Sequence, residues 1–308
     1  MNDYCLRVVS NRAGRLWQEA AKSIKPALSE DTLISYWDTL GDNPLCLDKM
    51  HTFSNHIQLI NRKWLNQLSN KRILPTLVSD HGLEQLIPRS FETACEAMEF
   101  AGKREIIWFV KRIHGTAGKG MYCVKTEDLL TLDLDKESVL QEGITDIALI
   151  EDKKFVTRVY LLCWNRKLFL FKRSFCVIHG VSYDRDSTEY DVQIDHSGYA
   201  DPNSSIQLVS LAETDYFESI IEGSIDLFSR LKPVLLDVLG ETSPIYYAIL
   251  GADVILEIAG NLRLIEINSF PNFIHTDDIN SKVNVPFLTS VLELVTGTRE
   301  NRNELISL

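Results

Sequence analysis

Asp253-Val-Ile-Leu-Glu-Ile-Ala-Gly-Asn-Leu-Arg-Leu-Ile-Glu-Ile-Asn268 is the stretch that decides how the fold is interpreted. Two runs rich in Val, Ile and Leu flank Gly260-Asn261, and this pair predicts a two-residue hairpin loop. With that loop, Asp253 faces Asn268 across the hairpin. Because side chains alternate between the two faces of a strand, Asp253, Glu266 and Asn268 share one face, within roughly 5–8 Å of one another.

Three oxygen-bearing side chains on one face of an apolar hairpin suit a hard cation such as Mg2+, which prefers oxygen ligands and keeps some waters for substrate phosphates. The alternative is the solvated face of an ordinary hairpin, with Glu257 and Arg263 as further surface charges near the turn. The sequence upstream of the hairpin favours the metal site.

Bulk composition indicates a globular protein of enzyme size. With 308 residues and 45% hydrophobic residues, we expect two or three lobes of one compact protein. A net charge of −11 argues against a nucleic-acid backbone or an anionic membrane surface as partner. We find no signal peptide, no long apolar span and no Cys-x-x-Cys pair among the 6 cysteines, so we expect a reducing, cytoplasmic location.

Hydrophobic periodicity predicts both helices and strands along the chain. A strand is expected at 6–9, and helices are expected at 12–24, 61–68, 91–102 (with Ser90 as N-cap), 215–239 (interrupted or kinked near Pro233) and 280–296. Residues 181–210 are polar and predict an irregular loop that closes over a ligand or is partly disordered.

A glycine-rich loop, Gly115-Thr-Ala-Gly-Lys-Gly120, lies between predicted strands at 106–110 and 121–124. Its glycines allow backbone N–H groups to approach an anion, and Lys111 and Lys119 add positive charge. The loop is not a P-loop, because Lys119 is followed by glycine and a strand rather than by Ser or Thr and a helix. No His-Arg-Asp or Asp-Phe-Gly sequence supports a protein kinase. The alternative is a plain flexible hairpin loop.

A second hairpin, 155–164 with 167–178, turns at Asn165-Arg166 and predicts that Arg158 lies opposite Arg173. Like charges directly opposite destabilise a sheet unless an anion lies between them. Lys154 shares the face of Arg158 and adds a third cation. This pattern favours an anion site, the alternative being three cations that face water at a sheet edge.

Taken in order, these segments resemble the ATP-grasp ligases and, within them, the tubulin tyrosine ligase-like family. The resemblance runs from about residue 55 to about residue 271, and 61–65 look like the family's segment before the glycine loop. The segments that carry it are Trp108-Phe-Val-Lys111, the glycine-rich loop, Val139-Leu-Gln-Glu142, Lys153-Lys-Phe-Val-Thr-Arg158, and Asp253 with Glu266-Ile-Asn268.

The resemblance implies an α+β protein with the ATP-grasp fold, in which two α+β lobes grip ATP. We expect a small N-terminal α/β lobe at 1–54, a central lobe with the glycine-rich loop at 55–142, and a C-terminal lobe with the Mg2+-binding hairpin at 143–308.

The resemblance also implies a role for each matching residue, with ATP and one or two Mg2+ as cofactors. The implied roles are phosphate binding by Lys111, Gly115, Gly118, Lys119 and Gly120; contact with the adenine edge by Gln141 and Glu142; nucleotide binding by Lys154; binding of the terminal phosphate or acyl phosphate by Arg158; and Mg2+ binding by Asp253, Glu266 and Asn268.

This chain departs from the family pattern in two places within the second hairpin. Val156 stands where the family typically has an aspartate, and Val177 stands where it has a second arginine. Lys172 or Arg173 can substitute for that arginine, and Arg173 also fits the cross-strand pairing, so it joins Arg158 as a candidate catalytic residue. The family's His-x-x-Asn segment has only a loose counterpart, around His196 and Asn203.

The implied activity is ATP-dependent carboxylate–amine ligation, in which an acyl phosphate forms and an amine then displaces phosphate. The implied substrates are an amino acid and a peptide, protein or amino-acid partner. Tubulin tails are acidic and this chain is acidic too, so we favour another acceptor, selected by residues 181–210. Two alternatives are an ATP-grasp phosphotransferase and a catalytically inactive nucleotide-binding protein.

Overall fold

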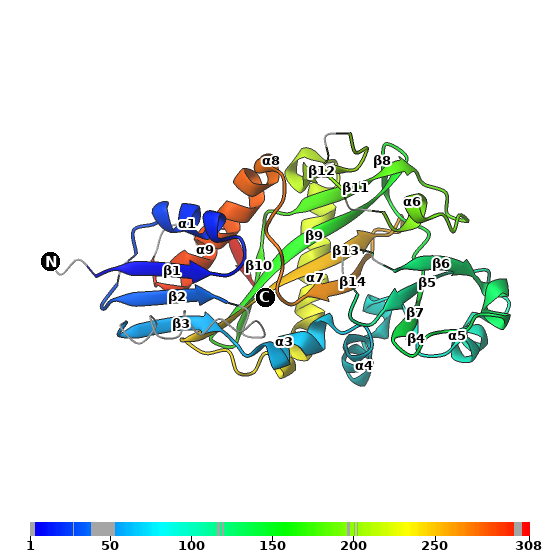
Figure 1. Cartoon of the computed structure of the whole chain (residues 1–308), viewed down its shortest axis with the longest axis horizontal. Coiled ribbons are helices and arrows are strands. Elements are labelled where there is room, and N and C mark those ends of the chain that lie inside the picture. The colour runs from blue at the N-terminus through cyan, green and yellow to red at the C-terminus, as the bar shows by residue number, and fades with distance from the viewer. Residues whose placement is uncertain are drawn as a thin grey trace.

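The computed structural model describes residues 4–26, 28–37, 53–115, 118, 120–195, 198–199, 201, 203–298 and 304–308. A large mixed sheet forms the middle of the molecule, and a small antiparallel sheet lies at one end of its long axis (Figure 1). The main path of the large sheet has the strand order β1-β2-β3-β13-β9-β10-β15, and the small sheet has the order β4-β7-β5-β6.

The strands of the large sheet are β1 (Leu6–Ser10), β2 (Thr32–Tyr36), β3 (Asn55–Leu59), β8 (Leu149–Ile150), β9 (Lys153–Trp164), β10 (Lys167–Phe171), β11 (Phe175–Ser182), β12 (Gln207–Ser210), β13 (Tyr246–Leu256), β14 (Leu262–Asn268) and β15 (Leu305–Ser307). Those of the small sheet are β4 (Ser90–Phe91), β5 (Ile107–Arg112), β6 (Tyr122–Lys125) and β7 (Ser138–Glu142).

The α-helices are α1 (Gly14–Lys22), α3 (Arg62–Ser69), α4 (Ile73–Asp80), α5 (Ala94–Ala101), α6 (Tyr190–Gln193), α7 (Phe217–Val238), α8 (Asp277–Ile279) and α9 (Val285–Val295). Short 3-10 turns are η1 (Glu84–Leu86), η2 (Thr126–Leu130) and η3 (Leu211–Glu213), and a π-helical turn, η4 (Asn280–Asn284), leads into α9. No helix in the described ranges is both long and apolar enough to cross a membrane.

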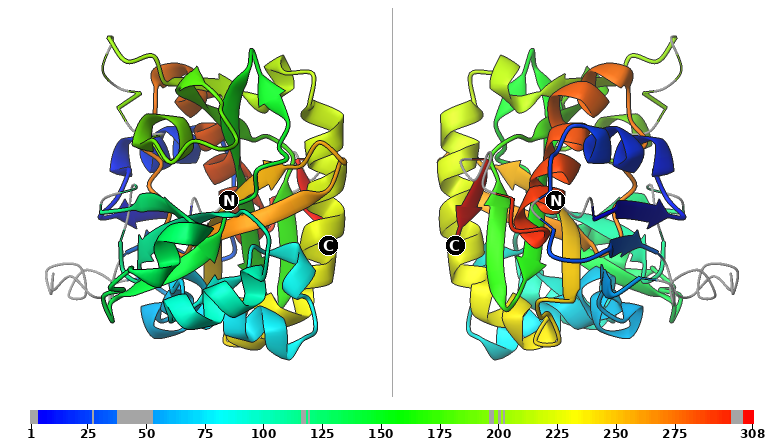
Figure 2. Two further views of the ribbon diagram at one scale, coloured as in Figure 1. Left: turned by 90° about the vertical axis from the view of Figure 1, so that its right-hand side faces the viewer. Right: turned by 90° about the vertical axis from the view of Figure 1, so that its left-hand side faces the viewer.

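Helices cover both faces of the large sheet (Figure 2). One face packs against α7, α3 and α4 in a single apolar cluster, and the other packs against α1 and α9 in a second cluster. In α7 the buried residues Ile220, Leu227, Leu231 and Leu235 recur at helical spacing, so one stripe faces the sheet. Pro233 lies inside α7, which continues to Val238.

The N-terminal strands continue into the large sheet. Strand β3 pairs in parallel with β2 on one side and with the start of β13 on the other. The predicted lobe boundary after residue 54 would separate β3 from β1 and β2, whereas β3 pairs directly with β2. The small sheet lies wholly inside the predicted central segment 55–142.

Strand β9 lies at the centre of the large sheet and pairs with β13, β10, β11 and β8. Its second half, Val159–Cys163, is fully buried, which explains the continuous apolar run in the sequence. Polar side chains occur in its first half, at Lys154 and Arg158, where the small sheet approaches.

The turn between β9 and β10 is confirmed, but the predicted pairing beyond it is wrong. Trp164 pairs with Lys167, and Asn165 and Arg166 have φ of 49° and 57°, as a type I′ turn requires. Arg158 pairs with Phe175 rather than with Arg173. The reason is that β10 ends at Phe171 and the chain starts a new strand, β11, before reaching the level of Arg158.

The β13–β14 hairpin also differs from the predicted register. Its loop is longer than Gly260-Asn261, since the N–H of Glu257 bonds the carbonyl of Asn261 at 2.9 Å. Asp253 consequently pairs with Glu266 rather than with Asn268, and the register shifts by a bulge beside Asp253. The cross-strand partner of Asp253 thus lies two residues earlier than predicted. Because side chains alternate with a period of two, Asp253, Glu266 and Asn268 still share one face.

Two local predictions are corrected. Helix α5 begins after Thr93, whose side chain accepts a hydrogen bond from the N–H of Glu96, while Ser90 belongs to β4. The segment 181–210 is not wholly irregular, because it contains the end of β11, helix α6 and strand β12.

Candidate functional site

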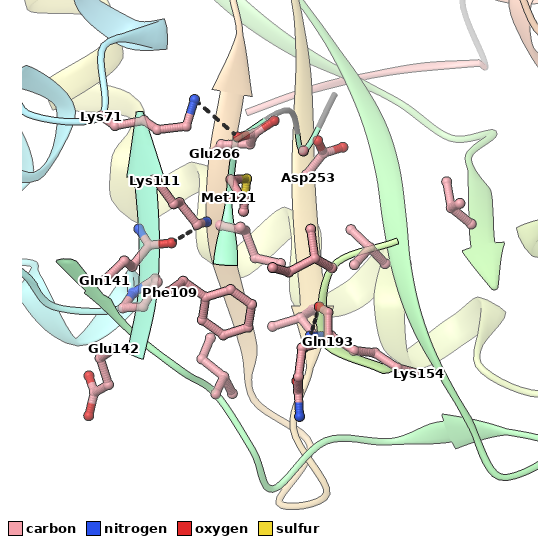
Figure 3. Close-up of a pocket in the computed structure, with 18 of the residues that line it drawn as sticks. Lys71, Phe109, Lys111, Met121, Gln141, Glu142, Lys154, Gln193, Asp253 and Glu266 are labelled. Carbon is pink, nitrogen blue, oxygen red and sulfur yellow. Dashed lines mark hydrogen bonds and ion pairs between the residues drawn. The ribbon is translucent and has the colours of Figure 1, made fainter. Parts of the chain in front are cut away.

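Most of the predicted site residues that the structure describes line one pocket between the two sheets (Figure 3). The small sheet contributes Phe109 and Lys111 from β5 and Gln141 from β7. The large sheet contributes cationic side chains from β9 and acidic side chains from β13 and β14. The pocket thus has a cationic and apolar wall on one lobe and a mixed, charged wall on the other.

The three predicted metal ligands lie together. The Asn268 amide nitrogen donates to Asp253 Oδ2 at 3.2 Å and to Glu266 Oε1 at 3.4 Å. Their shared face follows from the preserved alternation of the bulged hairpin. In the described part of the chain no three His, Cys, Asp or Glu residues form a group that could hold a metal. Two carboxylates and one amide nevertheless fit Mg2+, which takes its remaining ligands from water and phosphate.

Arg158 forms a bidentate ion pair with Asp253. Its Nε and Nη2 atoms donate to the two carboxylate oxygens at 2.5 and 2.9 Å, and the two side chains are only 18% and 13% exposed. Burial alone lowers the pKa of Arg158, but the Asp253 carboxylate outweighs burial and raises this pKa. Arg158 is therefore a fixed cation beside the candidate metal site.

Lys111 and Lys71 place two more cations on the opposite side of the candidate metal site. The Lys111 ammonium donates to Gln141 Oε1 at 2.5 Å, and burial lowers the pKa of Lys111 to about 8. Lys71, from the turn between α3 and α4, donates to the carbonyl of Gly115 at 2.8 Å and lies 3.8 Å from Glu266 Oε2. These positions suit the oxygens of a triphosphate.

The glycine-rich loop contributes Gly115 and Gly118 to the pocket. Gly118 and Gly120 have φ of 67° and 71°, a left-handed conformation that glycine adopts without a steric penalty. Gly120 is not among the lining residues and faces the Arg112 side chain. Lys119 lies outside the described residues.

Lys154 marks the other end of the pocket. Its ammonium donates to the carbonyl and side-chain oxygens of Gln193 at 2.8 and 3.3 Å, and it lies 5.0 Å from the Phe109 ring centre. Burial lowers the pKa of Lys154 to about 8. The surrounding wall is apolar and suits a flat nucleobase; it consists of Phe109, Met121, Ile144, Val156, Val177, Ile194, Ile255 and Ile265.

Gln141 and Glu142 lie where the chain leaves the small sheet. Both line the pocket, and their side chains already make hydrogen bonds within the protein. Gln141 bonds Lys111 and donates to Ser90 at 3.3 Å, while Glu142 Oε2 accepts from the N–H of Arg89 at 3.3 Å. Gln141 is thus placed to orient Lys111.

The two departures from the family pattern lie directly opposite each other. Val156 on β9 pairs with Val177 on β11, and both side chains line the pocket. A lone aspartate or a lone arginine at either position would face an apolar partner, whereas two valines leave no unpaired charge.

Arg173 lies outside the pocket, which corrects its predicted place. Its Nη2 atom lies 2.7 Å from Glu304 Oε1, and its side chain is 46% exposed. The nearby carboxylate raises the pKa of Arg173. Of the loose His-x-x-Asn counterpart, His196 lies outside the described residues, and Asn203 bonds Asp201 in an exposed turn.

Arg263 and Glu257 are not the surface charges of the alternative interpretation of this hairpin. They form an ion pair at 3.2 Å with side chains about one fifth exposed, and Arg263 Nη2 donates to the carbonyl of Ile87 at 2.7 Å. Ile87 lies just before the chain enters the small sheet. The Mg2+-candidate hairpin is therefore tied at its turn end to the connection between the lobes.

Sequence reasoning missed Lys71, Gln193 and Phe109 as pocket residues. Phe109 had a signal, since it lies two residues before Lys111 on the same face of one strand. Lys71 and Gln193 had none in the local pattern, because Lys71 lies in the turn between α3 and α4 and Gln193 ends the four-residue helix α6.

Comparison with known proteins identifies the fold. No family model matches the chain. The C-terminal domain of K. lactis Pby1, described as an ATP-grasp enzyme interacting with the mRNA decapping enzyme Dcp2, matches with a TM-score of 0.64. The match covers 98% of both chains at 15% identity. The chain has an ATP-grasp fold of the α+β class, as predicted.

A more specific likeness is to tubulin–tyrosine ligase. A probable tubulin–tyrosine ligase from Schizosaccharomyces pombe is 22% identical over 193 residues, which is 58% of this chain and 47% of that protein. The chain thus spans about half the length of this relative. The resemblance to the tubulin tyrosine ligase-like proteins, inferred from the motifs, is confirmed.

Proposed function

We propose that this protein is an ATP-dependent carboxylate–amine ligase that forms an amide bond between an amino acid and a peptide, protein or amino-acid partner. One observation carries the proposal: Asp253, Glu266 and Asn268 converge beside Arg158, with Lys71 and Lys111 across from them. This arrangement of two carboxylates, an amide and three cations suits a nucleotide triphosphate carrying a divalent ion.

In the first step, a carboxylate oxygen of one substrate attacks the γ-phosphorus of ATP, the bond to the bridging oxygen breaks, and ADP leaves. Lys71, Lys111 and the glycine-rich loop hold the phosphates, and Arg158 stabilises the transferred phosphoryl group. Asp253, Glu266 and Asn268 would hold one or two Mg2+, which when bound neutralise phosphate charge.

In the second step, the nitrogen of an amine attacks the acyl carbon, the carbon–oxygen bond to phosphate breaks, and the amine loses a proton. The cation at Arg158 stabilises the negative charge that develops on the carbonyl oxygen. No protein nucleophile takes part, so the reaction needs positioning and charge from the protein rather than a catalytic triad.

Two other functions make different predictions. An ATP-grasp phosphotransferase would use the same nucleotide site and release a phosphorylated product. A catalytically inactive nucleotide-binding protein is favoured by Val156 and Val177, but these residues form a matched apolar pair that leaves Lys154 and Arg158 in place. We therefore favour ligation.

The test is ADP release with Mg2+ and ATP over a panel of amino acids and peptides, with mass spectrometry of the products and hydroxylamine to trap an acyl phosphate. We expect a mass increase equal to one condensation, and loss of ADP release in Asp253→Ala and Glu266→Ala. Asp237→Ala, at an exposed position, is the matched control. A phosphorylated product would establish the phosphotransferase instead, and full activity in both site variants would refute the metal assignment.

A further inference from the structure

A cluster of three aromatic rings lies near Arg158, at the end of the site away from Lys154, and each ring comes from a different segment of the chain. Phe175 on β11 is the cross-strand partner of Arg158. Its ring centre lies 4.7 Å from the imidazole of His275, which follows the β13–β14 hairpin in the chain. Tyr199, from the segment 181–210, lies 5.9 Å from the same imidazole.

The hydrogen bonds of Asn284 determine the tautomer of His275. Asn284 is fully buried; its side-chain oxygen accepts from Tyr160, and its nitrogen faces the carbonyl of Phe273 at 3.1 Å and Asn280 Oδ1 at 2.7 Å. Because both of those partners only accept, the nitrogen must lie on this side. The same nitrogen is 2.9 Å from His275 Nδ1. An amide nitrogen does not accept hydrogen bonds, so Nδ1 can act toward it only as an acceptor that shares its two hydrogens with Phe273 and Asn280, and we assign the proton to Nε2.

His275 also stays neutral. Burial, with a contribution from the charge of Arg158, lowers the pKa of His275 to about 3. The residue as a whole is half-buried. At neutral pH the imidazole thus presents a fixed N–H donor rather than a group that changes charge.

Arg158 and Tyr199 lie within electrostatic reach of His275. Burial raises the pKa of Tyr199 while the Arg158 charge lowers it, and the phenol keeps its proton at neutral pH. Arg158 uses Nε and Nη2 for Asp253, and its Nη1 is the nitrogen nearest to Gly251: a Cβ on Gly251 would lie 3.4 Å from it. The same Cβ would lie 3.1 Å from Pro271, in the segment that leads to His275.

We propose that Arg158, His275 and Tyr199 form an oxyanion subsite that binds the carboxylate of the proposed ligase's substrate, with His275 Nε2–H and the Tyr199 hydroxyl as its neutral donors. The proposal rests on the proposed function and adds two residues that neither the motifs nor the relatives assign. One cation and two neutral donors fit a carboxylate, and the buried ring of Phe175 packs against the His275 imidazole and holds it in place. The subsite lies beside the candidate metal site because Arg158 belongs to both.

A binding experiment tests the subsite without any turnover. In 15N-labelled protein with Mg2+ and a non-hydrolysable ATP analogue, long-range 1H–15N spectra report the tautomer of His275. We expect a neutral imidazole protonated at Nε2 between pH 6 and pH 8, and a shift of its signals on titration with acetate. An imidazolium, a proton on Nδ1, or no response to acetate overturns the proposal. A stronger response to inorganic phosphate than to acetate assigns the subsite to phosphate and also overturns it.

A kinetic experiment uses the hydroxylamine trap with L-phenylalanine and L-glutamate as carboxylate substrates. Loss of one hydrogen bond to a charged group should raise KM for the carboxylate substrate about tenfold in His275→Phe and Tyr199→Phe, with KM for ATP changed less than about twofold. His81→Phe, at a histidine that bonds Asp237 on the far helices, is the control.

The outcomes separate this subsite from the proposed function. If the wild type gives no hydroxamate, the ligase proposal fails, while the acetate titration still decides the subsite. Equal rises of both KM values, or a fall in kcat alone, would contradict a carboxylate contact. His275→Phe removes a bond to buried Asn284, so thermal unfolding of each variant is compared, and Tyr199→Phe decides if His275→Phe does not fold.

Discussion

Replacing Asp253 by asparagine separates the two partners that this carboxylate serves, Arg158 and the candidate Mg2+. The guanidinium of Arg158 is only 18% exposed, and it would lose its charge partner while the shape of the side chain is kept. Hydrogen bonds to charged groups contribute about 1.5–3 kcal/mol, so the free energy of unfolding should fall by about that amount.

The same substitution should change the metal dependence of nucleotide binding. Two unit charges about 4 Å apart at an effective dielectric constant of about 20 interact by about 4 kcal/mol, and even a third of that is about tenfold in affinity. With its positive charge uncompensated, Arg158 should bind metal-free ATP about tenfold more tightly in Asp253→Asn. Binding with Mg2+ should weaken, because one carboxylate ligand is lost.

The measurements are urea unfolding and calorimetric titration with a non-hydrolysable ATP analogue, with Mg2+ and with EDTA. Asp237→Asn is the matched control, since Asp237 is 70% exposed and pairs with His81. A change below about 0.5 kcal/mol is expected there. An unchanged ratio of affinities with and without Mg2+, or a stability loss no greater than that of Asp237→Asn, would refute the reasoning.

Three further results are expected. ATP affinity, measured by titration, should fall as pH rises through about 8, because Lys111 and Lys154 lose their charge there. Without ligand, the free energy of unfolding measured in urea should rise from pH 8 toward 10.5, because the unfolded chain then binds more protons than the folded one. Arg263→Met should raise KM for ATP up to about tenfold, because the tie to Ile87 is lost, whereas exposed Arg230→Met should not; equal KM values in steady-state assays would contradict this. Arg173→Leu should keep ADP release within about twofold of the wild type, because Arg173 pairs with Glu304; a larger loss would restore its catalytic assignment.

The sequence was sufficient to predict that the metal-candidate side chains share a face, although the predicted register was wrong. A longer loop and a bulge moved the partner of Asp253 from Asn268 to Glu266. Because strand side chains alternate with a period of two, a shift of two residues changes every pair and leaves every face unchanged. Prediction from alternation is therefore more secure than prediction of individual cross-strand pairs.

The Arg158–Arg173 pairing failed for a reason that the sequence does not display. Extending a hairpin register assumes one unbroken strand, whereas the chain leaves β10 after Phe171 and pairs again as β11 from Phe175. Residues between these strands carry no glycine or proline that would mark the break. The break became visible only from tertiary pairing with β15 and β12.

Lys71, Gln193 and His275 could not be found from local patterns. Lys71 and His275 lie in connecting segments and Gln193 ends a four-residue helix, and each is brought to the site by packing between separate elements. The residues that the sequence did predict, such as Lys111 and Asp253, lie on strands, where periodicity determines direction. Site residues on strands were thus more predictable than site residues contributed by turns and short segments.

The position of Lys154 and Arg158 on one strand has a consequence for ligand size. They lie four positions apart on β9, which fixes about 13 Å between their Cα atoms. A central strand cannot shorten that interval, so in the proposed nucleotide complex a nucleoside monophosphate at Lys154 would fall short of Arg158, whereas a triphosphate would span the distance. Under that proposal the strand would select for the length of the phosphate chain, independently of which base it carries.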